Sequence, residues 1–178
     1  SAAGGYDIPN SLRFNDDDSA YLTRTPSTAS NRKTWTWSGW VKRGNINGAS
    51  QRIFMATSGA NYTSLYFHGT ETLYFLDNQT TTMCAKQTNS VFRDASAWYH
   101  IIVAVDTTQA TASNRYKLYI NGEEVISFNA NTDYPLNQDT IVNSNIAHDI
   151  GRLNSNIQFF DGYLAEVNFI DGLALTPD

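Results

Sequence analysis

Four consecutive polar residues near the beginning of the chain carry oxygen atoms of the kind that bind hard metal ions. The run is Asn15, Asp16, Asp17 and Asp18. Ca2+ takes about six to eight oxygen ligands from carboxylates, amides and carbonyls, and one turn can supply several of them. The same residue types also favour turns, because Asp and Asn side chains hydrogen-bond to the nearby backbone. Two interpretations therefore stay open: a solvated turn, or a calcium site in which Asp16 and Asp18 are ligands.

A second group of residues has the types that bind sugars. A carbohydrate site needs an exposed aromatic ring that stacks on the sugar, and amides or carboxylates that hydrogen-bond to its hydroxyl groups. Polar segments supply this combination in several places, and the candidate ligand-binding residues are Asn61, Tyr62, Asn78, Asp133, Tyr134 and Asn154. Loop polarity by itself would give the same residues, so each position is also compatible with an inert surface.

Residues suited to catalysis do not form a recognisable site in the sequence. Retaining glycosidases use two carboxyl groups about 5 Å apart, which on one strand means two acidic residues separated by one position. Glu123 and Glu124 are adjacent and therefore face opposite sides, and Glu166 shares its predicted face with Leu164 and Asn168. The three histidines are not accompanied by a Gly-x-Ser-x-Gly nucleophile motif. We expect no catalytic residues and no enzymatic activity.

Charge and composition argue against several classes of partner. The net charge is −5, and no cluster of Lys and Arg is longer than two residues. Nucleic acids and anionic membrane surfaces both require a basic face. No apolar run approaches the ~20 residues of a membrane span. The single cysteine, Cys84, excludes an internal disulfide and a Cys-based zinc site. We therefore expect no nucleic-acid partner and no insertion into a membrane.

The segments that position the candidate residues alternate polar and apolar side chains, which is the pattern of β-strands. Residues 34–43 give the strongest example, with Trp35 and Trp37 on one face. Asn121-Gly122 predicts a tight hairpin, because both central positions of a type I′ turn need positive φ. The predicted strands span residues 12–14, 20–23, 34–43, 51–57, 64–68, 72–77, 80–86, 98–106, 116–120, 123–128, 147–153 and 162–170, and residues 129–145 are predicted to form a loop.

About twelve short strands at spacings of roughly ten residues favour a sandwich or a barrel. Helical periodicity is nearly absent, and no linker-like stretch divides the chain. We predict a single all-β domain over residues 11–178, preceded by an N-terminal arm formed by residues 1–10.

Three stretches of the sequence resemble the laminin-G-like, concanavalin A-like jelly-roll superfamily. The first, Trp35-Thr-Trp-Ser-Gly-Trp-Val-Lys42, is similar to that family's aromatic-Thr-Ile-Ser-Ala-Trp-Val-Lys strand. The second combines Trp98-Tyr-His-Ile-Ile-Val-Ala-Val-Asp106 with the later Lys117-Leu-Tyr-Ile-Asn-Gly122. The third is Ile150-Gly-Arg152 followed by Phe160-Asp-Gly-Tyr-Leu-Ala-Glu-Val-Asn-Phe169. The resemblance covers residues 11–175 and implies a two-sheet antiparallel jelly-roll sandwich.

The ends of this region resemble the jelly-roll modules of tailed-phage virion proteins, such as tail fibres and capsid-surface decorations. The segments concerned are Ser11 to Leu22 and Asp171-Gly-Leu-Ala-Leu-Thr-Pro177. The likeness implies a non-catalytic recognition or structural module of a virion, which binds host-surface glycan or neighbouring virion subunits. We expect such a module to form homo-oligomers, because many weak sites gain by avidity.

Two further implications of the family stay open. One alternative to the virion is a carbohydrate-binding accessory domain of a secreted bacterial polysaccharide-degrading enzyme. The superfamily also contains glucanases, which have the motif Glu-x-Asp-x-x-Glu along one strand. No predicted strand of this sequence contains that motif. Some relatives bind Ca2+ at loop rims, so Ca2+ is the one cofactor that the resemblance suggests.

Overall fold

The computed structural model describes residues 9–154 and 156–177 of the chain. Most of the predicted N-terminal arm, residues 1–8, lies outside the described residues. The described elements are β1 (Leu12–Phe14), β2 (Leu22–Arg24), β3 (Thr34–Arg43), β4 (Gln51–Ser58), β5 (Asn61–Phe67), β6 (Thr72–Gln79), β7 (Thr81–Val91), β8 (Tyr99–Asp106), the 3-10 helix η1 (Ala112–Asn114), β9 (Tyr116–Ile120), β10 (Glu123–Glu124), β11 (Phe128–Thr132), β12 (Ala147–Ile150) and β13 (Gly162–Asp171). None of the described helical segments has the length and apolar character needed to span a bilayer.

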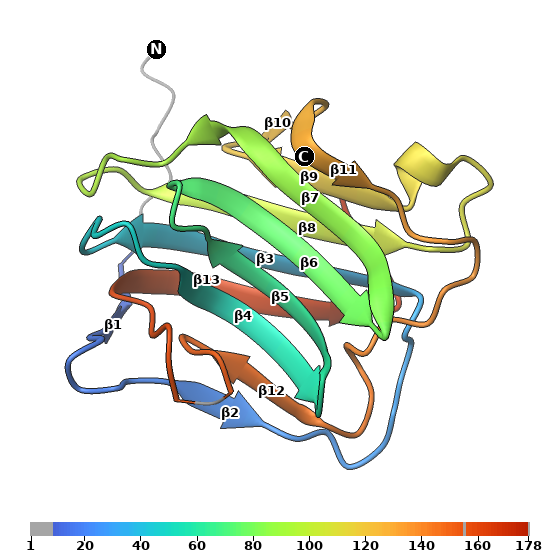
Figure 1. Ribbon diagram of the computed structural model, residues 1–178, viewed down its shortest axis with the longest axis horizontal. Helices are drawn as coiled ribbons and strands as arrows, with labels where there is room; N and C mark the ends of the chain where they lie inside the picture. Colours follow the sequence, from blue (N-terminus) through green and yellow to red (C-terminus); the bar gives the residue numbers. More distant parts are fainter. Residues whose placement is uncertain (1–8, 155, 178) are drawn as a thin grey trace.

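The strands form two antiparallel sheets that stack face to face (Figure 1). The six-stranded sheet has the order β1-β13-β3-β8-β9-β10, and the seven-stranded sheet has the order β11-β7-β6-β5-β4-β12-β2. In Figure 1 the strands β4 to β7 lie in front of the layer that contains β3, β8 and β13. This architecture confirms the prediction of an all-β, two-sheet antiparallel sandwich.

The tryptophans of β3 lie in the core between the two sheets. The exposed fractions of Trp35 and Trp37 are 0% and 1%. The Trp35 ring packs 6.3 Å from the ring of Phe75 and the Trp37 ring 6.5 Å from that of Phe54, both on the opposite sheet. At roughly 25 cal/mol per Å2 of apolar area, each buried indole stabilises the fold by several kcal/mol. The prediction that Trp35 and Trp37 lie on one face of this strand is confirmed, and that face is buried.

The hairpin at Asn121-Gly122 forms as predicted, but the chain leaves it sooner than expected. Both residues have positive φ, 52° and 85°, and they join β9 to the two-residue strand β10. The chain then crosses to the other sheet, where β11 pairs with β7. Residues 129–132 are therefore strand, and the loop predicted there is wrong. Pairing with an edge strand supplies backbone hydrogen bonds that outweigh the turn preference of this Asn-rich sequence.

A β-bulge in β13 reverses which residues face the core. Glu166 has a φ of 48°, and the register with β3 shifts between Ala165 and Asn168. Before the bulge Leu164 faces the core and is 3% exposed, whereas after it Phe169 faces inward and packs 6.1 Å from Phe54. The predicted uninterrupted alternation along this strand is wrong, because a bulge inserts one extra residue and moves the following side chains to the other face.

Candidate functional site

Strands β5 and β6 present tyrosines on the outer face of the seven-stranded sheet. Leu65 of β5 lies in the core, so its neighbour Tyr66 points outward. The register partner of Tyr66 on β6 is Tyr74, and the partner of Tyr62 is Asn78. We call the outward side formed by Tyr62, Tyr66 and Tyr74 the tyrosine face; within it Tyr66 is only 5% exposed, because Arg52 covers its ring.

An arginine stacks against the centre of the tyrosine face. The rings of Tyr66 and Tyr74 are stacked with 5.4 Å between their centres, and the guanidinium carbon of Arg52 lies 3.7 Å from the centre of the Tyr66 ring. Arg52 donates from Nη1 to Ser64 Oγ at 3.0 Å and from Nε to Gln158 Oε1 at 2.8 Å. Burial raises the pKa values of both tyrosines above the usual phenol value, so both hydroxyl groups keep their protons at neutral pH. These contacts fix the rings in place.

A shallow cavity of about 390 Å3 opens at the Tyr62 end of the tyrosine face. Its wall includes Met55 of β4, Tyr62 of β5, and Leu153 and Asn154 from the segment after β12. An aromatic ring and an exposed amide therefore lie in one hollow although they are far apart in the sequence. Asn78 is the register partner of Tyr62 on β6, on the side of β5 away from β4, and does not form part of the cavity wall. Three of the predicted ligand-binding residues, Tyr62, Asn78 and Asn154, are thus brought to one region.

Two other predicted ligand-binding residues use their side chains for contacts within the protein. Asn61 Oδ1 accepts a hydrogen bond from the backbone N–H of Thr80 at 3.0 Å, which supports the turn between β6 and β7. Asp133 forms an ion pair with Lys86, with 2.5 Å between Oδ1 and Nζ. The structure does not bring Asp133 to the cavity beside Tyr62.

Tyr134, which was predicted as an exposed stacking ring, lies in the core. Its exposed fraction is 1%, and its hydroxyl donates to Asp77 Oδ2 at 2.7 Å. Burial raises the pKa values of both groups. The expectation of an exposed ring at Tyr134 is wrong: the ring is enclosed in the core, and its hydroxyl satisfies a buried carboxylate, so it is not presented to a sugar.

The acidic turn between β1 and β2 is held by hydrogen bonds among its own side chains and to a neighbouring loop. Asn15 Nδ2 donates to Asp18 Oδ2 at 2.7 Å, and Asn45 Nδ2 donates to Asp16 Oδ2 at 3.2 Å. The second oxygen of Asp16 accepts from the backbone N–H of Asp17. Across residues 9–154 and 156–177, no three His, Cys, Asp or Glu side chains gather in a way that could hold a metal ion. These contacts favour the solvated-turn interpretation, and calcium binding by Asp16 and Asp18 stays a prediction.

Sequence reasoning missed Arg52, Tyr66 and Tyr74 because it looked for sugar-binding residues at loops and strand ends. A signal was present: Tyr62, Ser64 and Tyr66 recur at every second position of one strand. In a two-sheet sandwich, one such alternate set must lie on an outer face.

Comparisons with known proteins place this architecture among similar structures. Domains LG4-5 of the mouse laminin α1 chain align with a TM-score of 0.63 and 12% identity over 95% of this chain, which spans 44% of that chain. Domain 4 of the arabinanase AbnA from Geobacillus stearothermophilus, in complex with arabinotriose, aligns with a TM-score of 0.58 and 15% identity over 98% of this chain and 87% of that one. The CBM40 of a Ruminococcus gnavus sialidase, bound to α2,3-sialyllactose, aligns with a TM-score of 0.55 and 12% identity over 90% of this chain and 94% of that one. None of the curated proteins compared with the chain matches it in sequence.

The sequence also matches a family profile. Residues 15–178 match the laminin G family described as the concanavalin A-like lectin/glucanases superfamily. That description includes both lectins and glucanases, so it is compatible with binding and with catalysis. The match extends over most of the chain and agrees with the two-sheet architecture. The chain therefore belongs to the concanavalin A-like lectin/glucanases superfamily.

Proposed function

We propose that the chain is a non-catalytic module that recognises glycans at the cavity beside Tyr62. The observation that carries the proposal is that Tyr62 and Asn154 line the same hollow. A sugar offers an apolar C–H face, which packs on an aromatic ring, and hydroxyl groups, which exchange hydrogen bonds with an amide. A volume of about 390 Å3 falls within the roughly 300–1,000 Å3 of small-molecule sites.

The lining of the cavity supports binding without catalysis. The described residues that form its wall are apolar, hydroxyl or amide residues and include no carboxylate. Glycoside hydrolysis by the usual route needs two carboxyl groups that flank the bond. The adjacent Glu123 and Glu124 lie elsewhere, on β10 of the other sheet, and Glu124 forms an ion pair with Lys117.

We further propose a phage virion as the setting, with homo-oligomeric display of the module. This part of the proposal is supported by the sequence resemblance of residues 11–22 and 171–177 alone. Mass spectrometry of purified particles tests the location, and light scattering tests the oligomeric state. A chain that is released by secretion and absent from particles would favour the alternative, an accessory domain of a polysaccharide-degrading enzyme.

A glycan array followed by titration calorimetry tests the recognition itself. We expect wild-type protein to retain at least one glycan, and Tyr62→Ala to weaken that affinity several-fold to about tenfold, the value of one aromatic stacking contact. Asn154→Ala should weaken binding as well. The control is Tyr163→Ala, which removes a 37% exposed tyrosine from the other sheet and should leave affinity unchanged. Equal losses in Tyr62→Ala and Tyr163→Ala, or no glycan retained by the wild type, would refute the proposal.

A further inference from the structure

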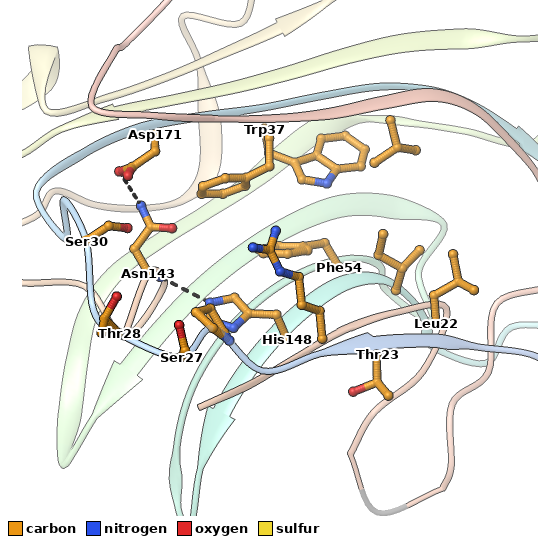
Figure 2. Close-up of a pocket in the computed structure, with 15 residues that line it drawn as sticks. Leu22, Thr23, Ser27, Thr28, Ser30, Trp37, Phe54, Asn143, His148 and Asp171 are labelled. Carbon is orange, nitrogen blue, oxygen red and sulfur yellow. Dashed lines mark hydrogen bonds between the residues drawn. The ribbon is translucent and has the colours of Figure 1, made fainter. Parts of the chain in front are cut away.

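A second cavity, of about 620 Å3, lies between the two sheets at the edge where β2 and β12 face β13. Figure 2 shows it with side chains of both sheets converging on it. Its apolar wall includes Leu22, Trp37, Phe54, Ile150, Val167 and Phe169. Two of these side chains, Leu22 and Phe169, are 49% and 39% exposed, so the apolar wall is open to solvent on both sheets.

A smaller cavity, of about 310 Å3, continues the larger one towards β1. The two walls share Leu22, Ile150 and Val167, and the smaller cavity adds Leu12 and Leu164. We call the two cavities together the edge groove. Because they share three apolar side chains, the apolar surface is continuous from β2 to β1. Large apolar side chains that share one exposed concave surface mark a place where an apolar partner is buried.

The strand register turns the side chain of Arg24 into the edge groove. In the pairing of β2 with β12, Arg24 lies opposite His148 and Leu22 lies opposite Ile150. In the pairing of β12 with β4, Ile150 lies opposite Phe54, which is a core residue. Residues directly opposite each other share one face of an antiparallel sheet. Leu22 and Arg24 therefore both lie on the inner face of β2, and both line the larger cavity.

The charge of Arg24 has no counter-ion within the protein. Across residues 9–154 and 156–177, no hydrogen bond or ion pair joins Arg24 to another residue. Burial is the main cause of the lowered pKa of His148, and the nearby charge of Arg24 lowers that pKa further, so the histidine opposite is neutral at neutral pH. The carboxylate in the same cavity, Asp171, accepts at Oδ1 from the backbone N–H of Asn31 at 3.1 Å and from Asn143 Nδ2 at 2.9 Å (Figure 2).

The two ends of the edge groove differ in charge. Three hydroxyl residues that follow Arg24 in the chain also line the larger cavity: Ser27, Thr28 and Ser30. Figure 2 shows them at the opposite end of this cavity from Leu22. Glu166 lies in the wall of the smaller cavity, where its charge would repel an anion. An amphipathic anion is therefore oriented with its charged group at Arg24 and its apolar part directed towards β1.

We propose that the edge groove binds an acyl chain that ends in a carboxylate, which pairs with Arg24 while the chain passes Leu22 towards Leu12. The positive charge of Arg24 selects the carboxylate. An alkyl chain can follow the groove from one cavity into the next, because its bonds rotate. The proposal does not depend on glycan recognition, since Tyr62 does not belong to the described wall of either cavity.

Decanoate and decan-1-ol form a matched pair of probes, equal in chain length and different in charge. Each is titrated below the concentration at which it aggregates, and 1H–15N spectra of labelled protein report the binding. We expect decanoate to bind roughly three- to tenfold more tightly than the alcohol, the value of a partly exposed charge-assisted contact. The largest shifts should lie at the amides of Leu22, Arg24 and Val167.

Two arginine variants test the role of the charge. Arg24→Gln should bind decanoate and the alcohol equally, whereas Arg93→Gln, which removes an exposed arginine outside the described wall, should keep the preference for decanoate. An inward-facing charge also protects an edge strand against pairing with another chain. If Arg24 serves only that purpose, the wild type binds both probes equally or not at all. Either result, or an unchanged preference in Arg24→Gln, overturns the proposal.

Two leucine variants test the path of the chain. Leu12→Asp places a charge in the smaller cavity, at a 49% exposed position, and should weaken decanoate binding about fourfold or more, the value of one methylene group left in water. Leu136→Asp, at a 54% exposed leucine outside the described wall, is the control and should bind like the wild type. Equal decanoate affinity of the two variants contradicts the proposal.

Light scattering on the same proteins tests another occupant of the groove, a second copy of the chain. A wild-type dimer that Leu12→Asp dissociates without a change in decanoate affinity would assign the groove to that contact and overturn the proposal. Tyr62→Ala should leave decanoate binding unchanged. A failure of glycan recognition and a failure at the edge groove are therefore distinguishable.

Discussion

A buried ion pair fastens β3 to the loop between β5 and β6, and its removal gives a sharp test of the packing. The Arg43 side chain is fully buried, and its Nη1 lies 2.5 Å from Glu71 Oε2 and 2.7 Å from the carbonyl oxygen of Phe92. The Glu71 side chain is 8% exposed, and its other oxygen accepts from the backbone N–H of Gly48 at 3.2 Å. The guanidinium carbon also lies 4.6 Å from the centre of the Phe67 ring.

The substitution Glu71→Gln keeps the size of the side chain and an acceptor for Gly48 but leaves the Arg43 charge without its counter-ion. Removing one partner of a buried pair costs about 3–5 kcal/mol of unfolding free energy. For a domain of this size each kcal/mol shifts Tm by about 2–4 °C, so we expect Tm to fall by roughly 6–20 °C. In the Arg43→Met background no charge is left behind, and the same Glu71→Gln change should cost less than about 1 kcal/mol.

Urea denaturation followed by tryptophan fluorescence measures all four proteins of this cycle. If the pair compensates a buried charge, the cost of Glu71→Gln in unfolding free energy depends on the residue at position 43. If Glu71→Gln costs the same in both backgrounds, or less than about 1 kcal/mol in the wild type, the pair does not compensate a buried charge.

Three further changes test other parts of the structure. Gly162→Ala places a Cβ 2.1 Å from a main-chain oxygen of β3 and should cost about 1–3 kcal/mol or more in urea denaturation; an unchanged midpoint would contradict this close approach. Tyr134→Phe removes the donor to the buried Asp77 carboxylate and should cost about 1.5–3 kcal/mol by the same assay, whereas a neutral effect would contradict the hydrogen bond. Burial lowers the pKa of His148, whose Nε2 accepts a hydrogen bond from the backbone N–H of Asn143. The stability that neutral His148 contributes to the fold is therefore complete above the ordinary histidine pKa of about 6.5. That stability is lost as pH falls through the lowered pKa. Thermal melts from pH 7.5 to 5 should show this loss in the wild type and less of it in His148→Asn; identical pH profiles would exclude it.

The parts of the fold that sequence reasoning predicted are those set by local pattern. The alternation around Trp35 and Trp37 places two indoles on one face of a strand, and only a second layer can cover them. The hairpin at Asn121-Gly122 follows from backbone preference alone.

The parts that sequence reasoning did not predict depend on contacts between distant segments. Phe128 to Thr132 becomes strand β11 because β7 offers it an edge, and the bulge at Glu166 becomes visible only in the register with β3. The burial of Tyr134 likewise depends on Asp77, which lies on another strand. Local propensity contains none of this information, because tertiary contacts override it.

The candidate site divides in the same way. Tyr62, Asn78 and Asn154 were predicted from residue type. Pairing of β5 with β6 brings Asn78 beside Tyr62, whereas Asn154 reaches the cavity only because the segment after β12 folds onto β4. That placement is held by a backbone hydrogen bond of 3.1 Å from Arg52 N–H to the carbonyl oxygen of Gln158. The spacing of motifs along the chain does not show which residues that are distant in the sequence come into contact.

Chemical-shift mapping shows whether a glycan is held at the Tyr62 end of the seven-stranded sheet. A glycan retained on the array is titrated into 15N-labelled protein, and the shifted amide signals are placed on the structure. We expect the largest shifts to cluster at Tyr62, Asn78 and Asn154. Shifts centred on β13 and the outer face of the six-stranded sheet, with the Tyr62 region unchanged, would show that the glycan binds elsewhere.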